Sequence, residues 1–260
     1  MAVAIADMKR VVMEAGQLAL TYYGKVSGSV KADLTVVSEA DAAVEDFLRS
    51  ALTALAPGYG YIGEETADSR APAAGETRTW IVDALDGSRA FVAGMPLWMP
   101  AVCLMSGDRP LAGAALNPAT RELFWAAEEG GAYCNDEALP QATSPSALEP
   151  NTFIFGPTNH HRTFAVDFPG RIYSLGGPIY QLCLLAKGAV AGLFFDPAIN
   201  LWDLALPSLL LSRTGAVLVY ASGRPVDLAE LMGRAKIPEP IFAGSPGMVA
   251  LLRERITYRG

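Results

Sequence analysis

The sequence has few imidazole and thiol side chains: two histidines and three cysteines among 260 residues. Cys103, Cys134 and Cys183 are far apart and form no Cys-x-x-Cys pair, which excludes a cysteine zinc site and a disulfide framework. We expect them to be reduced thiols in the core of a cytoplasmic protein. His160 and His161 are neighbours, and we expect them in a surface loop, with contact to a substrate as the alternative.

Three further features are missing. No run of 18 apolar residues and no signal-peptide core occurs, so we expect no membrane partner. Basic residues are not in excess, because 27 acidic residues outnumber 20 lysines and arginines, and the net charge of −7 argues against a nucleic-acid polymer. No Gly-x-x-x-x-Gly-Lys-Ser/Thr loop is present, which excludes a P-loop kinase. With 51% hydrophobic and 18% charged residues, the chain is expected to fold rather than stay disordered.

The first part of the chain has the pattern of two helices followed by antiparallel strands. A helix is expected over residues 3–23, ended by Gly24, and a second from the N-cap Ser38 to Leu55. The first helix is predicted from the helical spacing of Val3, Ala6, Arg10, Met13, Gln17 and Leu20. Strands are expected at 59–63 and 79–82, and an antiparallel meander at 100–105, 111–116 and 123–127.

The second part alternates short strands with helices, which is typical of α/β proteins. The strands are expected at 152–155, 171–174, 192–195 and 216–220, and the helices at 178–187 and 203–212. Residues 141–151 between the two parts are rich in proline, serine and alanine. We therefore expect an α+β subdomain at 1–145 and an α/β subdomain at 146–260.

Acidic residues gather at the ends of three predicted strands. They are Glu64 and Glu65 after Gly63, Asp83 and Asp86 within the run WIVDALDGS at 80–88, and Asp203 after Trp202, with Asp196 shortly before it. Carboxylates at strand ends are the ligands that Mg²⁺ prefers. Asp83 and Asp86 are three residues apart across a predicted turn, so both can face one site together with the Leu85 carbonyl. Gly87 and Ser88 then offer backbone N–H groups to an anion if a helix begins there.

Each acidic cluster also has an ordinary structural explanation. The Asp-x-x-Asp-Gly run can be a capped turn, Glu64 can lie in a solvated loop, and Asp203 can cap a helix. Asp41, three residues after Ser38, is placed as a capping-box acid. The occurrence of all these features in one chain favours a metal site. The acids at 83 and 86 do not form the Asp-x-Asp-x-Thr run of phosphatases with an aspartyl nucleophile, so we expect no covalent aspartyl phosphate.

In their order along the chain, these motifs resemble those of the inositol monophosphatase family of lithium-sensitive, metal-dependent phosphomonoesterases. The matching runs are Gly-Glu-Glu at 63–65, WIVDALDGSRAF at 80–91, GGAYCN at 130–135, Trp-Asp-Leu-Ala at 202–205 and the stretch 31–41 before the second helix. The resemblance covers roughly residues 10–220. It implies a layered αβαβα sandwich of the inositol monophosphatase and fructose-bisphosphatase type, α+β and α/β in character, and a homodimer.

The resemblance also implies a ligand set for two or three Mg²⁺ ions. Glu64, Asp83 and the Leu85 carbonyl would hold one ion, and Asp83, Asp86 and Asp203 a second. A third ion would lie near Glu64, with Asp41 in its outer shell. The remaining implied roles are Ser88 orienting the attacking water, Gly87 and Ser88 binding phosphate, and Asp196, Gly177, Asp86 and Asp203 contacting the substrate.

The reaction implied by the resemblance is hydrolysis of inositol monophosphate or a related sugar phosphate by metal-activated water. The chain departs from the family at Ala84, at Arg89-Ala90, and in the substrate wall at Gly176-Gly177-Pro178-Ile179. These departures leave open a 3′(2′),5′-bisphosphate nucleotidase, a histidinol-phosphatase or a fructose-1,6-bisphosphatase of the same fold. A non-catalytic relative that binds metal or phosphate is a further alternative.

Overall fold

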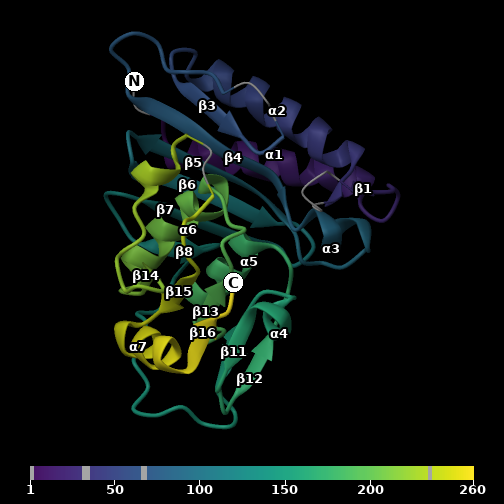
Figure 1. Cartoon of the computed structure of the whole chain (residues 1–260). Helices are drawn as coiled ribbons and strands as arrows, with labels where there is room; N and C mark the ends of the chain where they lie inside the picture. The colour runs from purple at the N-terminus through teal and green to yellow at the C-terminus, as the bar shows by residue number, and fades with distance from the viewer. Residues whose placement is uncertain (1–2, 31–35, 66–68, 234–235) are drawn as a thin grey trace.

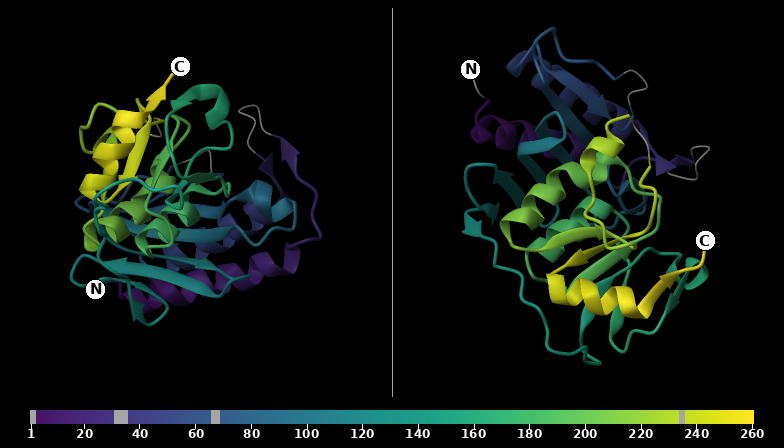
Figure 2. Two further views of the ribbon diagram at one scale, coloured as in Figure 1. Left: turned by 90° about the horizontal axis from the view of Figure 1, so that it is seen from below. Right: turned by 60° about the vertical axis from the view of Figure 1, so that its left-hand side comes forward.

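The computed structural model describes residues 3–30, 36–65, 69–233 and 236–260. Residues 31–35 of the matching stretch 31–41 therefore lie outside the described residues. Five layers alternate between helices and sheets (Figure 1). Helices α1 (Ile5–Tyr22) and α2 (Glu39–Leu55) lie on one outer side and α7 (Pro246–Arg255) on the other, as the two views of Figure 2 also show. The expected αβαβα sandwich is confirmed. None of the described helices combines the length and apolar composition of a membrane-spanning segment.

The larger sheet has seven strands in the order β3-β4-β5-β6-β7-β8-β9. They are β3 (Gly60–Gly63), β4 (Arg78–Asp86), β5 (Met99–Ser106), β6 (Arg109–Asn117), β7 (Glu122–Ala127), β8 (Ala132–Cys134) and β9 (Glu137–Ala138). Strands β4 to β9 pair antiparallel, as the meander pattern predicts, whereas β3 is parallel to β4. Because β3 and β4 are parallel, their carboxyl ends, which carry the first two acidic clusters, lie at the same edge.

The smaller sheet has five strands in the order β12-β10-β13-β15-β14. They are β10 (Phe153–Phe155), β12 (Arg171–Tyr173), β13 (Gly192–Phe195), β14 (Val217–Tyr220) and β15 (Ile241–Gly244). The first three pair in parallel, as the strand-helix alternation predicts, and β15 and β14 add antiparallel pairs. The remaining short elements are β1 (Ser29–Val30), β2 (Val36–Val37), α3 (Ser88–Val92), α4 (His160–Thr163), β11 (Phe164–Val166), η1 (Leu228–Leu231) and β16 (Ile256–Tyr258).

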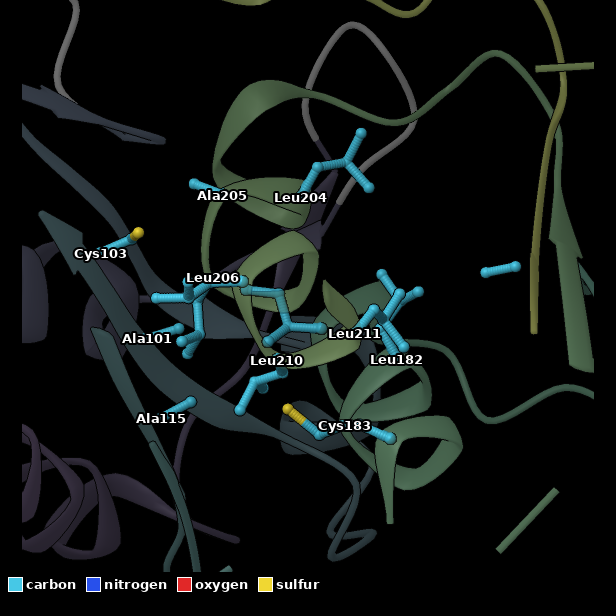
Figure 3. Close-up of a cluster of buried hydrophobic side chains, with 14 of the residues drawn as sticks. Ala101, Cys103, Ala115, Leu182, Cys183, Leu204, Ala205, Leu206, Leu210 and Leu211 are labelled. Carbon is cyan, nitrogen blue, oxygen red and sulfur yellow. The ribbon is translucent and has the colours of Figure 1, made fainter. Parts of the chain in front are cut away.

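Helices α5 (Pro178–Ala186) and α6 (Leu201–Arg213) fill the layer between the sheets. Leu206 and Leu210 of α6 point toward Ala101 of β5 and Ala115 of β6, whereas Leu182 of α5 packs next to Leu211, on the side away from these alanines (Figure 3). A Cβ atom at Gly113 of β6 would lie 2.7 Å from a Leu206 methyl carbon, so α6 packs tightly against the sheet there. Helix α6 is buried along most of its length because it lies between the two sheets. This packing fixes the position of its first turn, which carries Asp203.

Helix α1 confirms the predicted helix, but most of the residues whose spacing predicts it lie on the exposed face of the helix and not on the buried face. Ala6, Arg10, Met13 and Gln17 are exposed, whereas the buried residues are Met8, Val11, Val12, Ala15, Gly16 and Ala19. The two series have the same spacing, so periodicity alone cannot separate them. The contact with β6 decides which face is buried, because it accommodates only small and apolar side chains.

The other structural expectations have mixed outcomes. Cys103, Cys134 and Cys183 are buried free thiols, as predicted. His160 and His161 lie in the short helix α4 rather than in a loop. The chain passes from the larger to the smaller sheet between β9 and β10, but the division into subdomains at residue 145 stays a prediction.

Candidate functional site

The end of β4 carries Asp83 and Asp86, and both belong to the strand rather than to a turn. Asp83 pairs with Ala101 of β5 and Asp86 pairs with Met99, so β4 has one residue more than β5 over this interval. In a regular strand, residues three apart face opposite sides of the sheet. The extra residue forms a β-bulge that shifts the alternation of side-chain directions along β4 by one residue, and both carboxylates therefore face the same side of the sheet. The predicted turn is wrong, and a bulge brings the two acids together.

Asp203 of α6 completes a buried cluster with these two residues. One carboxylate oxygen from each of Asp83, Asp86 and Asp203 lies within 4.8 Å of the other two. The residues are only 2%, 2% and 7% exposed. Asp203 is the third residue of α6, and its carboxylate accepts the Asn200 N–H at 2.7 Å as the acidic member of a capping box whose N-cap residue is Asn200. Asp83 is fixed in a similar way by the Leu85 N–H at 2.9 Å.

The environment of the cluster favours the protonated acids when no cation is present. Burial raises the pKa of Asp86 and of Asp203 to about 7, although backbone hydrogen bonds oppose the shift. Burial raises the pKa of Asp83 well above its usual range, and repulsion from Glu64, Asp86 and Asp203 adds to the effect. Among the described residues, the charges that raise these pKa values belong to other carboxylates. Oxygen donors in this number and spacing fit a divalent cation such as Mg²⁺, which would offset the repulsion.

The first turn of α5 donates backbone hydrogen bonds to the Asp86 carboxylate. This carboxylate accepts the Ile179 N–H at 3.2 Å and the Tyr180 N–H at 2.9 Å. Gly177, the N-cap residue, lies directly against this carboxylate, because a Cβ atom there would be 2.3 Å from Oδ2. Pro178 occupies the helix start without loss of either hydrogen bond, since proline is tolerated at this position. The substrate-wall residue predicted at 177 thus contacts a predicted metal ligand.

Replacing Gly177 by alanine is expected to lower activity by about tenfold or more, because displacements near 1 Å at reacting groups have effects of that size or larger. The added methyl group would push Asp86 away from the cluster or move α5. The measurement is kcat at saturating Mg²⁺, with Gly58→Ala as the control, since the nearest atom to a Cβ at Gly58 is 3.8 Å away. A kcat of Gly177→Ala equal to that of the control would contradict the inference that Gly177 leaves the space that the Asp86 carboxylate needs.

Glu64 lies beside the cluster on the neighbouring strand. It follows β3, its N–H donates to the Val82 carbonyl of β4 at 3.2 Å, and its side chain is half-buried. Its negative charge raises the pKa of both Asp83 and Asp86. Of the four acids predicted as ligands, Asp83, Asp86 and Asp203 therefore converge in one cluster, and Glu64 lies near enough to act on their charges.

Asp41 and Ser88 form a hydrogen-bonded pair at the margin of the cluster. Ser88 Oγ is 2.6 Å from Asp41 Oδ1 and 2.9 Å from the Leu85 carbonyl oxygen. The other oxygen of Asp41 accepts the N–H and the hydroxyl of Ser38, each at 2.8 Å, which confirms the predicted capping box. Asp41 therefore joins the start of α2 to the β4–α3 connection, as well as capping its own helix.

Gly87 makes the sharp turn between β4 and α3. Its φ of 85° lies in the left-handed region, and a Cβ atom there would be 2.4 Å from the Leu97 carbonyl oxygen. Glycine is required for both reasons. The turn starts α3 at Ser88, next to Asp86, where the sequence predicts the phosphate-binding N–H groups.

The remaining predicted residues lie outside the buried cluster. Asp196 is half-buried just after β13, and its carbonyl accepts the Ala198 N–H. Arg89 is an exposed residue of α3.

Sequence reasoning missed Glu45 of α2, which is 2% exposed. Its carboxylate accepts the Glu65 N–H at 2.7 Å, at the turn that carries Glu64. The available signal was its position four residues after Asp41, in the same buried series as Val44, Leu48 and Leu52. A carboxylate within an apolar helical stripe indicates a buried partner.

Comparisons with known proteins agree with this geometry. The family model described as "Inositol monophosphatase family" matches residues 2–240. The histidinol-phosphatase of Mycobacterium tuberculosis is 33% identical over an alignment of 205 residues, which covers 74% of this chain and 77% of that protein. The inositol-1-monophosphatase of Mesorhizobium japonicum is 31% identical over an alignment of 222 residues, which covers 80% of this chain and 82% of that protein. The crystal structure of extragenic suppressor protein suhB from Bartonella henselae has the same fold, with a TM-score of 0.82, 24% identity and 96% of each chain covered. The chain belongs to the inositol monophosphatase family.

Proposed function

We propose that the protein is a Mg²⁺-dependent phosphomonoesterase that hydrolyses inositol monophosphate or a related sugar phosphate. The observation that carries the proposal is the buried cluster of Asp83, Asp86 and Asp203, with Glu64 beside it. Membership of the family supports the reaction class. Charge repulsion and positioning dominate the barrier to phosphate monoester hydrolysis, so an acidic site of this kind is useful only when it holds cations.

The proposed ligand sets follow from the positions of the acids. Glu64, Asp83 and the Leu85 carbonyl would hold one Mg²⁺, and Asp83, Asp86 and Asp203 a second. A third ion near Glu64, with Asp41 in its outer shell, completes the proposal. When bound, Mg²⁺ supplies positive charge that neutralises phosphoryl oxygens and acidifies water. The protein's part is to position these oxygen donors: burial keeps water away from Asp83, Asp86 and Asp203, and backbone N–H groups fix their carboxylates.

Ser88 is proposed to orient the attacking water. Its hydroxyl proton is directed toward Asp41 or the Leu85 carbonyl, so a lone pair of Oγ is available to accept a hydrogen bond from water. The N–H groups of Gly87 and Ser88 are proposed to bind the phosphate, and Asp196 and Gly177 to border the substrate alcohol. A homodimer in the cytoplasm is part of the same proposal.

A second candidate substrate is histidinol phosphate. The Mycobacterium tuberculosis relative named histidinol-phosphatase shares 33% identity with this chain, slightly more than the inositol-1-monophosphatase relative at 31%. The two candidates differ in the alcohol and share the phosphate chemistry, so the acid cluster serves both equally. Residues around the alcohol decide between them.

Release of inorganic phosphate from a panel of monoesters tests the proposal. The panel contains inositol 1-phosphate, histidinol phosphate, fructose 1,6-bisphosphate and adenosine 3′,5′-bisphosphate. We expect release from at least one with Mg²⁺, none with a chelator, and less when Li⁺ is added. The substrate with the highest kcat/KM identifies the subfamily. No release from any monoester, or release that persists with the chelator, would contradict the proposal.

A further inference from the structure

We propose that Glu45 of α2 is a positioning residue that holds Glu64 beside the carboxylate cluster. The inference rests on the proposed function only in requiring that the cluster binds a divalent cation. Glu45 is not a member of the cluster itself. It acts on the backbone of the Gly63-Glu64-Glu65 turn, through the residues on either side of Glu64.

The two oxygens of Glu45 contact the turn on both sides of Glu64. Oε2 accepts the Glu65 N–H at 2.7 Å. Oε1 lies so close to Gly63 that a Cβ atom there would be 2.4 Å from it. Between these contacts, the Glu64 N–H is held by the Val82 carbonyl at 3.2 Å. The backbone of the turn is therefore held by α2 on one side and by β4 on the other.

The turn needs such support because the strand ends immediately before it. The parallel pairing of β3 with β4 reaches only as far as Gly63 opposite Val82. Beyond that point the Glu64 N–H still donates to the Val82 carbonyl of β4, but Glu64 and Glu65 are no longer strand residues. The Glu64 side chain must nevertheless stay close enough to Asp83 and Asp86 to act on their charges. A contact from outside the sheet restores the missing constraint. Glu45 makes that contact from the second helical turn of α2, whose position is set by its packing on β4.

Stability alone does not account for a carboxylate at this position. Glu45 is 2% exposed, and burial of a carboxylate costs free energy that an apolar residue of similar size avoids. Its neighbours in the buried series, Val44, Leu48 and Leu52, are apolar. The carboxylate supplies an acceptor aimed at the Glu65 N–H of the turn. Groups that orient metal ligands in this way change metal affinity by about 10- to 100-fold when they are removed.

Direct Mg²⁺ binding, measured by titration calorimetry, tests the inference together with the Mg²⁺ dependence of phosphate release. For Glu45→Ala we expect the Mg²⁺ concentration at half-saturation to rise by about tenfold or more, with a smaller change in kcat at saturating Mg²⁺. Glu45→Gln keeps a carbonyl oxygen for the Glu65 N–H, so its affinity should stay close to that of the wild type. Gly63→Ala should reproduce the loss, because its methyl group displaces Glu45 while leaving every charge in place.

Two matched controls separate positioning from general effects. Asp46→Asn removes one charge from the adjacent, exposed position of α2, and Gly58→Ala adds a methyl group where the nearest atom is 3.8 Å away. Both should bind Mg²⁺ like the wild type. If Glu45→Ala does not fold, Glu45→Gln and Gly63→Ala carry the test.

The inference is overturned if Glu45→Ala or Gly63→Ala binds Mg²⁺ as tightly as the wild type. It is also overturned if Glu45→Gln loses as much affinity as Glu45→Ala, because the effect would then come from charge rather than from the hydrogen bond. Failure of the proposed function gives a different result: a wild-type protein that binds Mg²⁺ but releases no phosphate. A wild-type protein that binds no Mg²⁺ refutes both.

Discussion

Asp83→Asn is expected to reduce phosphate release by at least about 10³-fold, equivalent to about 4 kcal/mol of transition-state stabilisation. Asp83 is the acid shared by the first two proposed ion sites, so its loss weakens both at once. Asparagine has nearly the same shape, and its carbonyl oxygen can still accept the Leu85 N–H that Asp83 accepts at 2.9 Å. The loss should therefore come from the missing charge and not from a changed fold.

Stability of the metal-free variant provides the internal check on this prediction. The pKa of Asp83 is raised by burial and by three neighbouring carboxylates, which means that the ionised form is unfavourable without a cation. Asparagine removes that repulsion, so Asp83→Asn should unfold in chelator at the same temperature as the wild type or higher. It should also lose most of the stabilisation by Mg²⁺. The exposed turn residue Asp108, changed to asparagine, is the control, and a variant with activity within tenfold of the wild type would refute the assignment.

The metal-free protein is expected to become less stable as the pH rises from 5.5 to 8.5. Burial raises the pKa of Asp86 and of Asp203 to about 7, whereas in the unfolded chain an aspartate titrates near 4. The folded state thus binds more protons between these values, and its unfolding free energy falls with increasing pH. The stabilisation of the folded state by protons on Asp86 and Asp203 is fully present below about pH 4 and is lost as the pH passes through about 7.

We expect the unfolding free energy of the metal-free protein to fall by about 2 kcal/mol or more between pH 5.5 and pH 8.5, which corresponds to a Tm lower by roughly 5 °C in a chain of this size. Glu76 and Glu122, whose pKa values are lowered by hydrogen bonds to Arg78 and Lys187, titrate below this range and do not offset the change. Mg²⁺ competes with the protons, so its stabilising effect should be larger at pH 8.5 than at pH 5.5. Calorimetric unfolding with chelator and with Mg²⁺ measures both trends. Asp203→Asn should show a shallower pH dependence, and a metal-free Tm that rises over this range would contradict the prediction.

The element pattern was predictable wherever local signals were strong. The capping box at Ser38 and Asp41, the meander strands β5 to β7 and the buried helix α6 follow from caps, alternation and apolar runs. The buried face of α1 was not predictable, because Met8 and Met13 belong to series with the same period and only packing on β6 distinguishes them. The final segments β15, α7 and β16 were also missed. They are short, and α7 has little amphipathic character of its own.

The identity of the acids was predictable, but the way they converge was not. Motif order singles out Glu64, Asp83, Asp86 and Asp203, yet regular strand geometry would send Asp83 and Asp86 to opposite faces. The bulge against β5 corrects this, and it depends on a register that only the paired strands define. Glu45 and the N–H groups of Ile179 and Tyr180 are contacts between distant segments, so no local pattern indicates them.

The cluster of Asp83, Asp86 and Asp203 joins segments that are made at very different times during synthesis. Asp83 and Asp86 are in place once β4 has formed, whereas Asp203 arrives only with α6, after the first strands of the smaller sheet. A chain arrested before α6 carries two of the three acids, so we expect it to bind a cation more weakly than the complete chain. If the site holds Mg²⁺ as proposed, the ion favours the completed arrangement, and its binding shifts the folding equilibrium toward the finished fold by mass action. The ions proposed for the chemistry would thereby also favour completion of folding over half-assembled intermediates.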